Sequence, residues 1–182
     1  MGALSNRYPA KTLLIAGIAL FATLSLAGTG SSASRQHRQW DRLSAVACEY
    51  ADEARALALH AAEVLVSIDT LAGEASRSVP AEIMAREIGN PLAQVRRDAR
   101  DFRSAVRSFE IGMRRLCEGR ADGASLRNAT EWFNNLVQEI NAAQDEFSRT
   151  QRRLGELQTI YLLRSESLDP IRRIGKEPGF DQ

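Results

Sequence analysis

The chain has 182 residues, enough for one domain with a buried core, and its 24 Lys and Arg against 23 Asp and Glu leave a net charge of +1. Because positive and negative charges nearly cancel, the protein has no overall electrostatic field that would attract nucleic acid or an anionic surface. Helix-forming residues abound and no alternating run typical of a strand stands out, so we expect an all-α protein.

Residues 1–27 have the composition of a signal peptide or membrane anchor. Arg7 and Lys11, without an acid, precede a stretch of apolar and small residues. Ser25 and Ala27 place small side chains at the third and first positions before a candidate signal-peptidase cleavage site. These features favour export, and the uniformly apolar character disfavours a mitochondrial presequence.

The same segment also permits a retained anchor. No charge occurs from residue 12 to residue 34, which is long enough for a membrane span. Either a cleaved signal or a tether formed by residues 12–28 places the rest of the chain outside the cytoplasm, in the periplasm or secreted. Residues 28–35 are mostly Gly and Ser and predict a flexible linker.

A long heptad pattern follows the linker. Apolar residues recur at alternating steps of three and four, which predicts an amphipathic helix with a continuous seam. The seam consists of Trp40, Leu43, Ala47, Tyr50, Ala54, Leu57, Ala61, Val64, Ile68, Leu71 and Ala75. We expect this helix to fade over residues 73–78.

Two further helices are predicted. Pro80 opens a short helical piece over residues 81–88. Residues 89–91 either end this piece, with Gly89 as its C-terminal cap and Asn90 as the N-cap of the next helix, or form a kink within one longer helix. The second seam is Leu92, Val95, Ala99, Phe102, Val106, Phe109, Met113 and Leu116. The third is Leu126, Ala129, Phe133, Leu136, Ile140, Ala143, Phe147, Thr150, Leu154, Leu157 and Tyr161.

Short loops make consecutive helices antiparallel neighbours, so residues 36–165 predict an antiparallel up-down-up three-helix bundle of coiled-coil type, with a short tail over residues 166–182. A definite register follows from matching the seams. It pairs Ala54 with Phe109, Leu57 with Val106, Phe109 with Phe133, Phe102 with Ile140 and Val95 with Phe147.

The two cysteines test this register. Cys48 and Cys117 fall on flanks where the first two helices meet, so an exported chain is expected to join them by a disulfide. The alternative is two half-buried free thiols. Neither cysteine has a histidine at nearby helical spacing, so catalytic thiol chemistry is not indicated.

A basic stripe runs along the second helix, and two interpretations are open. It consists of Arg96, Arg100, Arg103, Arg107 and Arg114. One interpretation is binding of phosphates, lipid headgroups or an acidic partner. The other, which we favour, is ion pairing within the bundle, with Arg96 near Asp69 and Glu110 near Arg55.

The outer side of the first helix is unusually apolar. The residues concerned are Ala58, Leu59, Ala62, Leu65 and Val66. A helix that is apolar most of the way round is typically covered on all sides, and an exposed apolar patch usually marks an interface. A protein partner, a second copy of the chain or the C-terminal segment is expected to cover it.

No motif for catalysis, metal or cofactor binding is present in the sequence. We therefore expect a non-enzymatic envelope scaffold or accessory subunit, without cofactor or nucleic acid, that acts by protein–protein contact or self-association. The alternative is a periplasmic helical sensor or carrier for a small apolar ligand, held where the small residues Ala99 and Ala143 leave space.

Overall fold

The computed structural model describes residues 32–119 and 125–174. Outside these ranges lie the predicted signal or anchor, residues 28–31 of the predicted linker, residues 120–124 between the second and third predicted helices, and residues 175–182 of the tail. The elements are α1 (Ser32–Ser78), α2 (Ala81–Ile83), the π-helical turn η1 (Met84–Gly89), α3 (Asn90–Cys117) and α4 (Leu126–Ile174).

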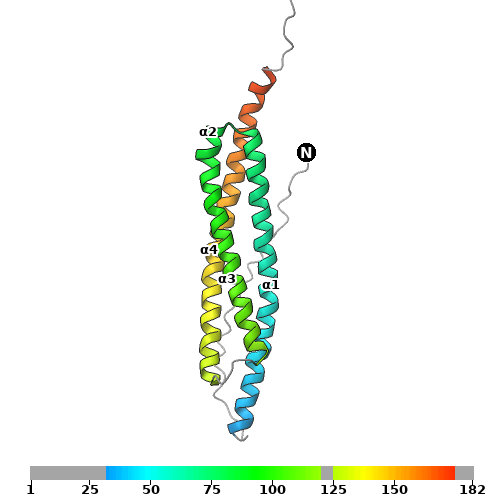
Figure 1. The fold of residues 1–182 in the computed structure, drawn as a ribbon, viewed down its shortest axis with the longest axis vertical. Coiled ribbons are helices and arrows are strands. Elements are labelled where there is room, and N and C mark those ends of the chain that lie inside the picture. Colours follow the sequence, from blue (N-terminus) through cyan, green and yellow to red (C-terminus); the bar gives the residue numbers. More distant parts are fainter. Residues whose placement is uncertain (1–31, 120–124, 175–182) are drawn as a thin grey trace, which may run out of the picture.

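The described residues are nearly all helical and contain no strand, and three long helices pack against one another, as Figure 1 shows. The all-α prediction is confirmed. α3 contacts both α1 and α4 extensively, whereas α1 and α4 touch each other less. Contacts between α1 and α3 occur in opposite order along the two helices, namely Cys48 with Cys117, Arg55 with Glu110, and Asp69 with Arg96.

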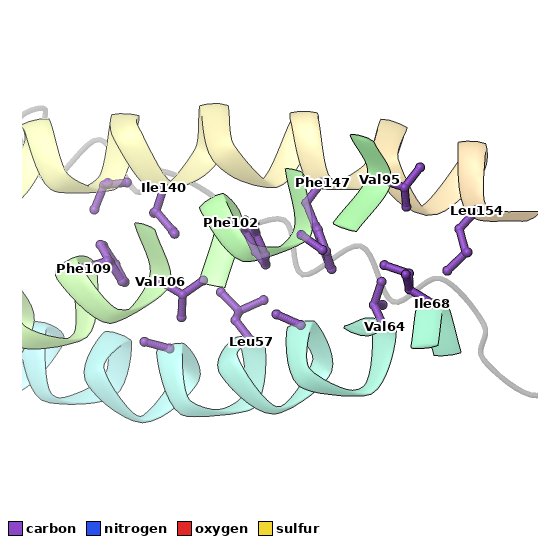
Figure 2. Packing of buried hydrophobic residues seen from close by; sticks show 14 of the residues in the cluster. Leu57, Val64, Ile68, Val95, Phe102, Val106, Phe109, Ile140, Phe147 and Leu154 are labelled. Carbon is purple, nitrogen blue, oxygen red and sulfur yellow. The ribbon is translucent and has the colours of Figure 1, made fainter. Parts of the chain in front are cut away.

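The heptad seams form the core, which Figure 2 shows between α1, α3 and α4. Ala54, Ala61 and Ala75 of α1 are fully buried, so that small side chains on α1 face large ones such as Phe102 and Phe109 of α3. This division of sizes lets two helices approach closely without a void. Ala51 and Val137 are also buried although they lie beside the predicted seams.

The helix ends follow local signals in the sequence. Gly119 ends α3 with a positive φ of 67°, the left-handed conformation that favours glycine after a helix. The Ser125 hydroxyl accepts a hydrogen bond from the backbone N–H of Asn128 at 3.3 Å and so caps the N-terminus of α4. Residues 32–35, which we assigned to the linker, already belong to α1.

The short segment after Pro80 continues directly into α3, so Gly89 and Asn90 do not act as caps. Both residues have right-handed helical dihedrals, and the backbone N–H of Asn90 bonds to the carbonyl of Ala85 in a π-helical turn. Pro91 has no N–H, and its ring would crowd the preceding turn of an α-helix. The wider π turn gives that ring room and keeps the chain helical.

The predicted register between the second and third helices is wrong by one heptad. Phe102 stacks on Phe147, with ring centroids 4.1 Å apart, and not on Ile140. In Figure 2, Ile140 lies above Phe109 and Leu154 lies beside Val95.

In the register that the structure has, α3 and α4 approach closely at Gly112. A Cβ atom on Gly112 would lie 2.6 Å from Cδ1 of Leu136, so Leu136 packs against a bare backbone position of α3. Ion pairs follow the same register: Asp98 lies 3.9 Å from Arg153, and Glu87 accepts two hydrogen bonds from Arg164. A shift by seven residues preserves every apolar position of a heptad, so the seams alone do not distinguish the two registers.

α4 continues to Ile174, although we expected the helical bundle to end at residue 165. Up to residue 167, Ile160 and Tyr161 are the last apolar side chains of α4 that pack on the core, and Leu162 and Leu163 are exposed. Figure 1 shows this end of α4 projecting beyond α2.

Candidate interaction surface

The structure joins Cys48 and Cys117 at disulfide distance, with the sulfur atoms 2.01 Å apart and the Cα atoms 4.8 Å apart. The bridge links α1 to the C-terminal end of α3. Beside it, the Ser44 hydroxyl donates a hydrogen bond of 2.6 Å to the Cys117 carbonyl, one of the carbonyl groups that the end of a helix leaves unpaired. The bridge and this hydrogen bond together hold α3 in a fixed position along α1.

The five apolar residues predicted for the outer side of α1 fall into two groups. Ala58 and Leu65 are half-buried and pack against the core. Leu59 and Val66 project into solvent, with 68% and 65% of their surface exposed, and Ala62 lies half-buried between them. Because Leu59 and Val66 are seven residues apart, they share one face of the helix.

The apolar character of α1 is also evident in its hydropathy. Within Ser34–Ser78, α1 is long and apolar enough to cross a membrane by length and composition, a property shared by core helices of soluble proteins. Only 28% of its most apolar window is buried inside the bundle. The contacts among α1, α3 and α4 therefore leave much of this apolar helix uncovered by the described residues.

The basic stripe of α3 is paired at its two ends. Arg96 pairs with Asp69 of α1, and Arg114 lies 3.0 Å from Glu110, which is also 3.4 Å from Arg55. Both ion pairs between helices that we predicted, Arg96 with Asp69 and Glu110 with Arg55, are thus confirmed. Such partly exposed pairs contribute little stability, about 0–1 kcal/mol each.

The middle of the stripe behaves differently. Arg100, Arg103 and Arg107 are exposed and make no ion pair or side-chain hydrogen bond with the residues that the structure describes. Internal ion pairing, the interpretation that we favoured for the whole stripe, therefore accounts for Arg96 and Arg114 only.

A groove of about 320 Å³ opens on the other flank of α3, facing α4. Phe102, Phe147, Ala105 and Ala143 supply its apolar lining, and Asp98, Asp101 and Glu146 supply three carboxylates. Ala143 lines this groove, but Ala99 is fully buried and does not, so the groove is not the space between core layers that the sequence suggested. Its carboxylates make it acidic.

His60 is held by its neighbours on α1 and α4. Its Nε2 lies 2.6 Å from the amide nitrogen of Gln151, which donates to it, and its ring meets Phe147 edge-on at 5.8 Å. Nδ1 then carries the proton and faces Glu63 at 3.6 Å. Within residues 32–119 and 125–174, no group of three or more His, Cys, Asp or Glu is placed to hold a metal ion.

Among the residues that the structure describes, Tyr50 is the side chain whose pKa is clearly shifted. Burial among Phe109 and Phe133 raises the pKa of its hydroxyl above the ordinary value of 10.0, and the nearby carboxylates Glu53 and Glu49 add to the rise. The ring is partly buried and packs edge-on against Phe109 of α3 and Phe133 of α4, so the shift reflects packing.

Comparisons of this chain with protein-family models, curated proteins and solved structures find no match.

Proposed function

We propose that this protein is a non-enzymatic, exported or membrane-tethered helical bundle that acts by contact with another protein through the outer side of α1. The observation that carries the proposal is the exposure of Leu59 and Val66 on one face of a helix whose heptad seam is buried in the core. Large exposed aliphatic side chains on a rigid element are typical of a docking surface.

The finer architecture belongs to the same proposal. We infer that α1, α3 and α4 run up, down and up as antiparallel neighbours, which is supported by the opposite order of the contacts between α1 and α3. The disulfide between Cys48 and Cys117 supports an extracytoplasmic location because such bonds persist in oxidising compartments. The apolar residues 12–28 are the proposed signal or tether.

A photo-crosslinking residue placed at position 59 in the native host tests the interaction. We expect a specific adduct with a partner or with a second copy of the chain, and we expect Val66→Glu to remove it. Leu163 provides the matched control position, since it is exposed to 63% at the far end of α4. Equal adducts at positions 59 and 163 would contradict the proposal.

Location is tested by the intact mass of the protein from its native host, measured after alkylation with and without reduction. Removal of residues 1–27 would indicate a cleaved signal, and full length a retained tether. We expect the cysteines to react only after reduction, and ready alkylation without reductant would contradict the extracytoplasmic location.

The groove between α3 and α4 favours a second candidate function, the binding of a small ligand. The carboxylates of Asp98, Asp101 and Glu146 suit a cationic ligand, in contrast to the apolar ligand that the sequence suggested. A thermal-shift series with small amines and with uncharged apolar compounds separates these cases. If neither class of compound raises the melting temperature as its concentration increases, the ligand function is ruled out.

A further inference from the structure

The structure brings two features that are separate in the sequence onto one surface. Between the ion pairs Arg55–Glu110 and Asp69–Arg96, α1 and α3 lie side by side. Ala62 is midway between the two pairs along α1, and Arg103 is midway along α3. The register therefore places Arg103 beside Ala62, with Arg100 and Arg107 a helical turn to either side.

We call this the seam surface: Leu59, Ala62 and Val66 of α1 with Arg100, Arg103 and Arg107 of α3. Its apolar edge and its basic edge run parallel to the helix axes. The carboxylates at its two ends, Asp69 and Glu110, are occupied by Arg96, Arg114 and Arg55. The middle of the seam surface thus combines exposed aliphatic side chains with three arginines that have no acidic partner among the described residues.

This combination restricts what the surface binds. A wholly apolar partner that covered Leu59 and Val66 would remove water from the neighbouring guanidinium groups without replacing their hydrogen bonds, which is costly. A second copy docked through the same surface by a two-fold axis supplies no carboxylate to these arginines. Depending on the direction of the axis, they face the second copy's arginines or cover its Leu59 and Val66, and repulsion or desolvation without a counter-ion disfavours either dimer.

We infer that the seam surface binds an acidic amphipathic helix, whose apolar residues pack on Leu59 and Val66 and whose carboxylates pair with Arg100, Arg103 and Arg107. The seven-residue spacing of Leu59 and Val66 matches the spacing of apolar residues along one face of a helix. Such a partner lies along α1 and α3 as a fourth helix. The inference rests on the proposed function and specifies the partner's chemistry.

An anionic membrane also complements arginine, but the surface fits it less well. Helices that bind in the plane of a membrane insert a broad apolar face, typically with Trp, Phe and Leu side chains. The seam surface offers only Leu59 and Val66 as large apolar side chains, and it has no aromatic residue. We therefore favour the helical partner and treat lipid as an outcome of the test.

The test uses the full chain in zwitterionic detergent and two synthetic helical peptides that differ only in charge. Both carry Leu at heptad spacing, and the flanking positions are Glu in one peptide and Lys in the other. By fluorescence anisotropy, we expect the wild-type chain to bind the Glu peptide at least about tenfold more tightly than the Lys peptide, a difference that shrinks in high salt.

Charge reversal then identifies the site. Arg103→Glu with Arg107→Glu is expected to reverse the preference, so that the Lys peptide binds more tightly. Arg152→Glu is the matched control, because Arg152 is exposed on α4 away from the seam surface and is expected to leave the preference unchanged. Leu59→Glu is expected to weaken binding of the Glu peptide, whereas Leu163→Glu is not.

The outcomes separate the inference from the proposed function. If Leu59→Glu weakens binding of both peptides but the arginine variants leave the peptide preference unchanged, the docking surface stands and the acidic partner is refuted. If neither set of variants changes binding, both proposals fail. Arginine-dependent binding to phosphatidylglycerol vesicles without any peptide preference would assign the surface to lipid and overturn the inference.

Discussion

Replacing Phe102 and Phe147 by leucine, singly and together, measures how α3 and α4 are aligned. The two rings are stacked at 4.1 Å with an interplanar angle of 10°, and both are almost fully buried. Each single change removes part of a packed ring and is expected to cost about 1–2 kcal/mol of unfolding free energy, less than the 3–5 kcal/mol typical of Phe→Ala. With leucine at both positions, the summed loss of unfolding free energy stays below the roughly 5–15 kcal/mol by which a typical domain is stable, so the double variant still folds and can be measured.

The informative quantity is the coupling between the two changes. A stacked aromatic pair contributes about 0.5–1.5 kcal/mol beyond its buried area, so the double variant should be less destabilised than the sum of the singles by that amount. Urea denaturation followed by far-ultraviolet circular dichroism supplies the three free energies, provided that the denaturant slopes agree.

The matched control is the pair Phe102→Leu and Ile140→Val. Ile140 lies two helical turns, about 10 Å, from Phe147 along α4, and changes so far apart usually add. We expect a coupling near zero for this pair. A larger coupling of Phe102 with Ile140 than with Phe147 would refute the observed register and restore the one expected from the heptads alone.

Three further outcomes are expected. Reduction of the bond between Cys48 and Cys117 opens a loop with a sequence separation of 69, which in the chain-entropy model lowers the unfolding free energy by about 4 kcal/mol; an unchanged urea midpoint with and without reductant would contradict this. Because the pKa of Tyr50 is raised in the folded state, the folded protein holds this proton above pH 10.0 while the unfolded chain releases it. Stability therefore falls as pH rises above 10.0, and Tyr50→Phe should flatten that decline in urea titrations at alkaline pH. Gly112→Ala should stabilise the protein by up to about 1 kcal/mol when Leu136 is also alanine, through helix propensity, but not in the wild type, where the new methyl group meets Leu136; equal effects in both backgrounds would show that the contact is unimportant.

The sequence was sufficient to predict the helices and their apolar faces. Alternating steps of three and four identify the buried positions of α1, α3 and α4 because a helix repeats its faces every seven residues. The disulfide and the ion pair of Arg96 with Asp69 followed from aligning the first two seams, since both lie on the flanks where those helices meet. Ser125 and Gly119 likewise act locally, through capping.

Only the tertiary structure decided how α3 and α4 are aligned and which outer residues remain exposed. The alignment is not encoded in the heptad pattern, because a shift by one heptad leaves the pattern unchanged, and no disulfide links α3 to α4 among the described residues. In this alignment Leu136 packs against the bare backbone of Gly112, a residue that carries no apolar signal of its own. Similarly, Leu59 and Leu65 are equally apolar in the sequence, but only Leu65 packs on the core, because exposure depends on where the neighbouring helix lies.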